Sequence, residues 1–209
     1  MDPPSLGWKV QLMIDPAREV QIRSRAVLSD NWYKLEEVTF VQTRRDGSHQ
    51  TLKREVYHNG PGAAVLPVDR ARGTVLLVRQ FRMPAFVNGD TAMLIELCAG
   101  MVEEGHDPAD TVRKEAEQEM GVRLRGIRKV FGLYPSPGAS AEKLHLFVAD
   151  YGPGDVVGRG GGVRGEGEEI ETLELPISRA WEMVMAGEIV DAKAVLLLQH
   201  LRLAEQGGT

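Results

Sequence analysis

Segments with the residue pattern of β-strands dominate this chain and narrow the folds that it can adopt. Runs that alternate between apolar and polar residues, or that are apolar throughout, recur between turn residues along most of the sequence. Helical patterns are few, and strands and helices do not follow one another in regular βαβ order. We therefore predict an α/β (α+β) fold, in which a mixed sheet packs against helices.

The first strands of the chain form a group of their own. Residues 20–43 are rich in strand-forming side chains, Asp46-Gly47 is a turn signal, and residues 51–58 supply a return strand. This pattern predicts a small antiparallel sheet at the N-terminus. We expect residues 1–57 to hold a loose lead-in and this sheet, and residues 58–209 to form the main domain.

The main domain is expected to contain the remaining strands and three helices. The run MLIELCAG is apolar on both faces, as a central strand would be. The other expected elements are a hairpin over residues 63–82, a loop around 84–90, strands near 122–134, 143–151 and 168–176, a glycine-rich loop at 158–167, and helices near 107–120, 177–186 and 191–204.

The first of these helices has recognisable ends. Asp107 is a suitable N-cap, Pro108 suits the first helical position, and Gly121 suits the C-terminal cap. These residues predict a helix over Asp107–Met120.

Charge and composition exclude some partners. The formal net charge is -5, so neither a nucleic acid nor an anionic membrane is an expected partner. No apolar stretch approaches the length of a membrane span, and the first residues lack the apolar centre of a signal peptide. The only cysteine, Cys98, lies in an apolar run and suits a reducing compartment. A cytoplasmic protein is therefore expected.

The helix over Asp107–Met120 carries the residues with the clearest chemistry. Glu115 and Glu119 are one turn apart, so they share a helix face, whereas Glu117 points away and Gln118 borders that face. Like charges at this spacing repel each other weakly in an isolated helix. A divalent cation reverses that repulsion, and Mg²⁺ prefers hard oxygen ligands. A solvated charged face is the alternative.

The stretch from Ala99 to Val122 resembles the motif of the Nudix hydrolase family. The family spacing is met by Gly100, Glu115, Glu119 and Gly121, with aliphatic residues at 116 and 122. Three positions depart from the motif: His106 and Gln118 each replace a glutamate, and Lys114 replaces an arginine. Losing a carboxylate at position 118 should weaken Mg²⁺ binding, because hard cations favour anionic oxygen.

Further phrases resemble the nucleoside diphosphate-sugar pyrophosphatases of that family, most of all their bacterial GDP-mannose branch. Among them are RQFRMPAFVNGD, GGGVRGEGEEIETLELP and GEIVDAKAVLLLQHL. The resemblance implies a Nudix α/β/α sandwich with a mixed sheet and an N-terminal antiparallel β-sheet that swaps or packs across a homodimer. It also implies metal-dependent hydrolysis of a nucleoside diphosphate sugar to a nucleoside monophosphate and a sugar 1-phosphate.

The same resemblance implies the site residues. Mg²⁺, with Mn²⁺ as the alternative, would be held by Glu115, Glu119, Glu168 and the backbone carbonyl of Ala99. Glu166 is the nearest candidate to orient or deprotonate the attacking water. The roles of Glu166, Glu168 and Glu169 are left open, because the glycine-rich loop allows a shift in register.

Five residues are candidates for substrate binding: Arg54, Glu55, Arg79, Arg82 and Ser136. An arginine offers a phosphate a fork of N–H donors. The alternative is that these residues are ordinary polar positions on strands and turns. Three functions compete: hydrolysis of GDP-mannose, hydrolysis of ADP-ribose, and binding of a nucleotide sugar without turnover.

Overall fold

The computed structural model describes residues 19–162, 165 and 167–207. The chain divides into two compact units, residues 1–58 and 59–209, which are described one at a time. Across the described residues, none of the helices combines the length and apolar character needed to cross a membrane.

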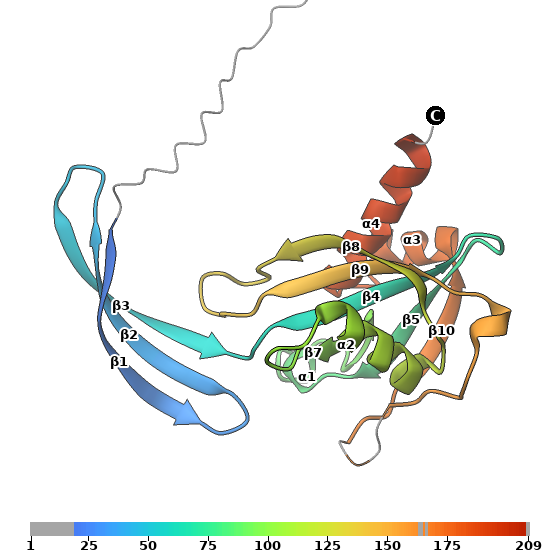
Figure 1. Cartoon of the computed structure of the whole chain (residues 1–209), viewed down its shortest axis with the longest axis horizontal. Coiled ribbons are helices and arrows are strands. Elements are labelled where there is room, and N and C mark those ends of the chain that lie inside the picture. Colours follow the sequence, from blue (N-terminus) through green and yellow to red (C-terminus); the bar gives the residue numbers. More distant parts are fainter. Residues whose placement is uncertain (1–18, 163–164, 166, 208–209) are drawn as a thin grey trace, which may run out of the picture. The chain divides into compact units, whose positions relative to one another are not determined.

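The first unit contains a three-stranded antiparallel sheet, as expected (Figure 1). Its strands lie in the order β1 (Val20–Asp30), β2 (Lys34–Thr43) and β3 (His49–His58). The turn between β2 and β3 is closed by Asp46, whose side chain accepts a hydrogen bond from the backbone N–H of Ser48, while Gly47 adopts a φ of 80°. A positive φ is accessible to glycine without a steric cost, so the Asp-Gly pair determines this turn.

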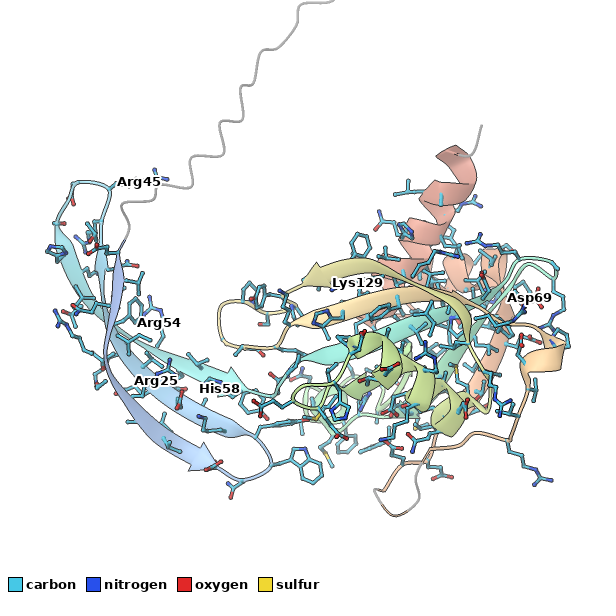
Figure 2. All side chains as sticks on the ribbon, viewed as in Figure 1. Arg25, Arg45, Arg54, His58, Asp69 and Lys129 are labelled. Atoms are coloured by element: carbon cyan, nitrogen blue, oxygen red, sulfur yellow. The ribbon has the colours of Figure 1, made fainter. Side chains whose placement is uncertain are left out.

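This first unit has almost no apolar core of its own. Among its described residues, Val38 is the only apolar side chain that is buried. The buried polar residue is Glu36, whose carboxylate accepts hydrogen bonds from Arg25 (3.1 Å) and Lys34 (2.9 Å) and lies 2.9 Å from His58 Nε2. Figure 2 labels Arg25 and His58, which belong to the two outer strands of this sheet. Besides the backbone ladders, the contacts of Glu36 with Arg25 and His58 therefore link the three strands through side chains.

The second unit is built on a mixed sheet. Its main path runs β10-β5-β4-β9-β8, with β6 paired to β5 and β7 paired to β4. The pair β4–β9 is parallel and the other pairs are antiparallel. The strands are β4 (Gly62–Asp69), β5 (Thr74–Phe81), β6 (Met93–Glu96), β7 (Cys98–Met101), β8 (Arg125–Leu133), β9 (Leu144–Asp150) and β10 (Glu171–Pro176).

Helices cover both faces of this sheet, which makes the predicted sandwich (Figure 1). One apolar cluster joins Leu66 of β4 to α3 (Ile177–Met185) and α4 (Ala192–Gly207). A second cluster joins Val65, the neighbour of Leu66, to α2 (Pro108–Glu115) and the π-helical turn η1 (Ala116–Met120). Adjacent residues of a strand point to opposite faces, so β4 is buried along its whole length and is apolar up to its last residue, Asp69.

The predicted helix over Asp107–Met120 is confirmed, with one difference. Asp107 caps its start by accepting a hydrogen bond from the N–H of Ala109 at 2.8 Å, and Gly121 ends it with a φ of 67°. The last five residues are π-helical instead of α-helical. Wider π turns of this kind are frequent at functional sites.

Two details of the second unit differ from the expectation. A short helix, α1 (Met83–Val87), lies where a loop was predicted, because Pro84 near its start favours one helical turn. The run MLIELCAG is not one strand: β6 ends at Glu96, and β7 begins at Cys98 against a different neighbour. The change of partner at Leu97 moves the chain from β5 to β4.

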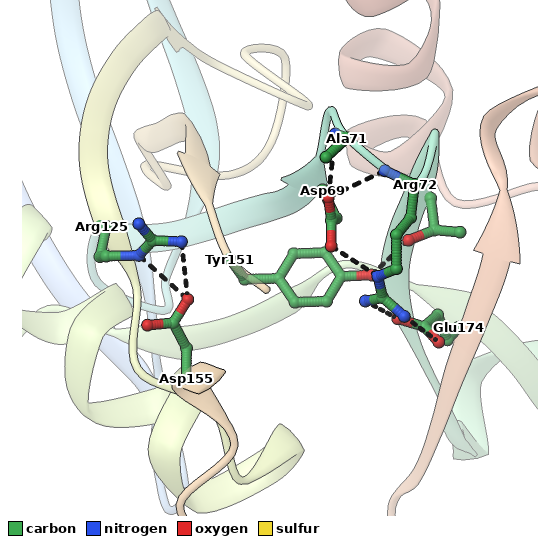
Figure 3. Close-up of polar contacts among 8 residues, drawn as sticks. Asp69, Ala71, Arg72, Arg125, Tyr151, Asp155 and Glu174 are labelled. Carbon is green, nitrogen blue, oxygen red and sulfur yellow. Dashed lines mark hydrogen bonds and ion pairs between the residues drawn. The ribbon is translucent and has the colours of Figure 1, made fainter. Parts of the chain in front are cut away.

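A polar network closes one end of the sheet (Figure 3). Asp69 accepts hydrogen bonds from the backbone N–H groups of Ala71 and Arg72, both at 3.0 Å, and from Arg72 Nε at 2.6 Å. Arg72 also donates to Glu174, which in turn accepts a hydrogen bond from the Tyr151 hydroxyl at 2.8 Å. This network joins the β4–β5 turn to β10 and to Tyr151, the residue that follows β9.

Candidate active site

The carboxylates of the first long helix point as the helical spacing predicted. Glu119 is buried, with 2% of its surface exposed, and Glu115 is half-buried. Glu117 is exposed and forms an ion pair with Arg123 at 3.4 Å. Glu115 and Glu119 therefore face the sheet, and Glu117 faces solvent.

Gly100 on β7 leaves the space into which the Glu115 side chain fits. A Cβ atom on this glycine would lie 2.6 Å from the Cδ atom of Glu115, which is closer than carbon atoms can approach. Glycine at position 100 is therefore needed for the Glu115 side chain to lie where it does.

The glycine-rich loop is tied to the end of the helix by backbone hydrogen bonds. The N–H of Gly161 donates to the carbonyl of Glu119 at 2.8 Å, and the N–H of Gly162 donates to the carbonyl of Gln118 at 3.2 Å. Helix ends leave carbonyl groups without partners, and this loop supplies donors for two of them. A Cβ on Gly160 would lie 2.8 Å from the Glu119 carbonyl carbon, so the close approach depends on glycine.

That attachment brings Glu168 towards the helix carboxylates. A Cβ on Gly162 would lie 2.7 Å from Glu168 Oε2, so this side chain folds back over the loop. The Glu168 charge also acts on Glu119, together with that of Glu115. The three predicted metal-site glutamates, two from the helix and one from the late loop, are therefore within electrostatic range of one another at Glu119.

Glu119 has an unusual environment for a carboxylate. The pKa of Glu119 is raised to about 7. Burial is the largest cause and the nearby charges of Glu115 and Glu168 add to it, while hydrogen bonds from the Cys98 thiol and the backbone of Ala99 oppose the shift. Within the described part of the chain, Oε2 of Glu119 has no hydrogen-bond partner. A buried charged oxygen without a donor is costly, and such groups usually coordinate a metal or a cation.

The donor set suits a hard divalent cation. One oxygen of the buried Glu119 has no partner among the described residues, the charges of Glu115 and Glu168 act on this carboxylate, and the backbone of Ala99 forms a hydrogen bond to it. The side chains of the described residues form no group of three acidic, histidine or cysteine ligands that could hold a metal ion unaided. Mg²⁺ does not need one, since it usually keeps waters or takes phosphate oxygens as further ligands.

The other predicted site residues are less closely gathered. Glu166, the candidate base, lies outside the described residues, and Glu169 is exposed. Ser136 is exposed in the β8–β9 loop, where its carbonyl accepts the N–H of Ser140 at 2.9 Å. Arg54 and Glu55 are exposed on β3 of the first unit. Figure 2 labels Arg54 on that sheet.

The two candidate arginines of β5 have different surroundings. Arg79 is exposed and forms an ion pair with Glu171 of β10, the strand that pairs with β5. Arg82 follows β5 and donates from Nε and Nη2 to the two oxygens of Glu96, at 2.7 and 2.9 Å. Glu96 raises the pKa of Arg82, and Glu119 and Asp191 add to this effect. Arg82 is therefore within electrostatic range of one helix carboxylate, that of Glu119.

Sequence reasoning missed Glu96 and its second neighbour, Lys193. Glu96 is buried at 3% exposure, and Lys193 Nζ lies 3.8 Å from its Oε2 and 2.6 Å from Asp191 Oδ1. The available signal was one acidic residue inside the apolar run MLIELCAG. Charged residues are rarely buried unless they are paired, so this position called for a cationic partner.

The departures from the family motif lie at the edge of this group. His106 is exposed and approaches Glu103 Oε2 at 3.9 Å, and Lys114 is exposed on α2. Gln118 is half-buried, and its backbone carbonyl is used by the glycine-rich loop. Of the three departures from the motif, only the one at position 118 is therefore next to Glu119.

Comparison with known proteins adds independent findings. Residues 19–57 match the family model described as the GDP-mannose pyrophosphatase NudK N-terminal domain, and residues 58–198 match the NUDIX domain. The chain is 48% identical over 185 residues to a GDP-mannose pyrophosphatase of Cronobacter sakazakii, covering 88% of this chain and 95% of that protein. It is 49% identical over 177 residues to the protein of that name from Salmonella typhimurium, covering 84% and 91%. The Klebsiella pneumoniae protein is 48% identical over 177 residues, covering 84% and 88%.

Proposed function

The chain belongs to the Nudix hydrolase family, and we propose that it hydrolyses the pyrophosphate bond of GDP-mannose to GMP and mannose 1-phosphate. The single observation that carries the site of this reaction is the buried Glu119, whose Oε2 has no partner within the described residues and on which the charges of Glu115 and Glu168 act. The substrate is proposed from the relatives, which bear the name GDP-mannose pyrophosphatase and align over most of this chain.

Mg²⁺ is the proposed cofactor, with Mn²⁺ as the alternative. The residues that would hold it are Glu115, Glu119, Glu168 and the carbonyl of Ala99. When bound, such an ion offsets the charge of the diphosphate and lowers the pKa of a coordinated water.

The remaining chemistry is assigned to side chains of this chain. Glu166 is the proposed base that accepts a proton from the attacking water, with Glu168 and Glu169 as the alternatives. Arg82 and Arg79 are the proposed ligands of the diphosphate. Arg54 and Glu55 remain substrate-binding candidates, with Arg54 suited to phosphate and the Glu55 carboxylate to hydrogen bonds with the base. Ser136 is proposed to line the substrate site from the β8–β9 loop. A guanidinium group can bind two phosphate oxygens at once, which fixes both position and charge.

The test is a panel of nucleotide sugars incubated with the full chain and either Mg²⁺ or Mn²⁺. Products are separated by ion-exchange chromatography and identified by ³¹P NMR. GDP-mannose should give GMP and mannose 1-phosphate with the highest kcat/KM of the panel. A highest kcat/KM for ADP-ribose would replace the proposed substrate but keep the reaction. Binding of GDP-mannose without turnover under either metal would contradict hydrolysis.

A homodimer and a cytoplasmic location belong to the same proposal. The first unit leaves a set of apolar side chains exposed, and three strands without a covered apolar face are not expected to be stable alone. The set is Val20, Ile22, Val27, Leu28, Trp32 and Tyr57. A second copy of the chain is the proposed cover, with residues 1–57 as the dimerisation region and 58–209 as the hydrolase domain. The single buried cysteine suits a reducing compartment.

A further inference from the structure

The contact between Arg82 and Glu96 carries an inference that the family motif does not contain. Arg82 ends the ladder between β5 and β6, where its backbone N–H donates to the carbonyl of Ala92 at 2.7 Å. Glu96 lies on β6 opposite Val78 of β5. The Arg82 side chain therefore runs back along the hairpin to reach Glu96.

The geometry of this contact leaves one edge of the guanidinium available. Arg82 uses its Nε and Nη2 groups to bind the two oxygens of Glu96. A guanidinium has five N–H donors, so in the part of the chain that the structure describes three remain, on Nη1 and Nη2. The Arg82 side chain is 42% exposed, whereas that of Glu96 is only 4% exposed. The bound edge of the guanidinium thus faces the interior, and the Nη1–Nη2 edge is the one that a ligand can approach.

Glu96 itself is held in place from the other side. Lys193 lies 3.8 Å from Glu96 Oε2 and is held by Asp191 at 2.6 Å. Asp191 is fixed in turn, because its other oxygen accepts a hydrogen bond from the N–H of Ala194 at the start of α4, at 3.0 Å. The Glu96 carboxylate is therefore anchored to β6 by its backbone and to the N-terminal end of α4 through Lys193.

We propose that Glu96 is a positioning residue for the substrate: it clamps the Nε–Nη2 edge of Arg82 so that the Nη1–Nη2 edge binds the diphosphate. This inference rests on the proposed function. An arginine held on one side loses little side-chain freedom when it binds a phosphate on the other, so the clamp favours substrate binding. Glu96 acts through Arg82 and does not touch the substrate.

The experiment compares Glu96→Gln and Glu96→Asp with the wild type in steady-state hydrolysis of GDP-mannose. Glutamine keeps the shape of the side chain but accepts only one strong hydrogen bond from the fork, and aspartate keeps the charge but is shorter. KM should rise on the order of 10-fold in Glu96→Gln, with a much smaller change in kcat, because the clamp serves binding. The KM of Glu96→Asp should lie between that of the wild type and that of Glu96→Gln.

A double-mutant cycle with Arg82→Ala separates positioning from a merely structural role. If Glu96 acts through Arg82, the KM of the double variant should equal that of Arg82→Ala alone. Additive effects on KM would overturn the inference. This comparison remains decisive when Glu96→Gln also lowers Tm, because KM is referred to the folded, active fraction.

The matched control is Glu174→Gln, which breaks the other fork-shaped pair, between Glu174 and Arg72, in the network of Figure 3. It should lower Tm and leave KM unchanged. An equal rise of KM in both variants would overturn the inference. Absence of hydrolysis by the wild type would overturn the proposed function and this inference with it, whereas an active wild type with unchanged KM in Glu96→Gln would overturn the inference alone.

Discussion

At the residue scale, the site depends on a carboxylate whose buried charge destabilises the metal-free protein. Glu119 is buried beside two other glutamates, and one of its oxygens has no partner among the described residues. Burial of an unpaired charge destabilises a fold unless the group takes up a proton or binds a cation. The free energy of unfolding and metal binding should therefore be linked at this one side chain.

Glu119→Gln should stabilise the metal-free protein at neutral pH while abolishing turnover. Folding raises the pKa of Glu119 from 4.5 to about 7. The free energy of unfolding of the metal-free protein is therefore highest below pH 4.5 and falls as the pH rises to about 7, because the buried carboxyl group loses its proton. Glutamine cannot ionise, so the variant should avoid a loss of about 3 kcal/mol at full ionisation. Urea unfolding in EDTA at pH 5 and pH 8 measures this difference. Glu117→Gln, on the exposed face, is the control and should change neither the free energy of unfolding nor turnover.

Gln118→Glu tests the departure from the family motif nearest to Glu119. The half-buried side chain at 118 would gain a charge next to the other carboxylates. Because Mg²⁺ favours anionic oxygen, the Mg²⁺ concentration for half-maximal activity should fall several-fold. Titration of activity with Mg²⁺ measures this. Equal metal dependence in wild type and variant would show that Gln118 does not limit metal binding.

At the element scale, the glycine-rich loop is a structural part of the site. Its backbone supplies donors to the carbonyls of Gln118 and Glu119, and this attachment places Glu168 near the helix. The glycines of this loop therefore act through packing. They do not form a phosphate-binding loop, which would need a strand, a helix and a lysine at set positions.

Gly160→Ala should detach this loop from the helix. Gly160 has a φ of 62°, and a Cβ would lie 2.8 Å from the Glu119 carbonyl carbon. Strain of this kind costs about 1–3 kcal/mol, and the loop can relieve it only by moving away with Glu168. Activity should fall about 10-fold or more, since a small misplacement of a catalytic group has such effects. Gly154→Ala, in the same β9–β10 connection with no atom within 4 Å of its Cβ position, is the control for both activity and Tm.

At the scale of the whole molecule, the two units differ in how they are stabilised. The second unit buries apolar clusters on both faces of its sheet. The first unit buries only Val38 among its described apolar residues and relies on the contacts of Glu36. A sheet of this kind needs a cover, and a second copy of the chain is the cover that we propose.

Ile22→Glu should weaken the proposed dimer. Ile22 is 50% exposed on β1, and a glutamate there would place a charge in an apolar interface. Light scattering coupled to size-exclusion chromatography should give a dimer for the wild type and a mass shifted towards the monomer for the variant. Thr51→Glu, at an exposed polar position on β3, is the control and should remain dimeric. A monomeric wild type at micromolar concentration would contradict the dimer.

Local patterns determined much of this protein. The Asp46-Gly47 turn, the cap at Asp107 and the helix end at Gly121 follow from the conformations that these residues favour, and the structure has all three. The four-residue spacing of Glu115 and Glu119 follows from the geometry of a helical turn. The spacing was enough to predict that both would share one helix face and that Glu117 would point away from it, but not that this face would meet the sheet.

Only the tertiary structure decided which distant groups meet. The burial of Glu119, the return of Glu168 over the glycine loop and the clamp of Glu96 on Arg82 join segments that are far apart in the chain. Such contacts depend on how the strands pair, as in the change of partner at Leu97 that ends β6 at Glu96. Short-range residue preferences carry no information on that pairing, because it is decided by the burial of apolar surface over the whole sheet.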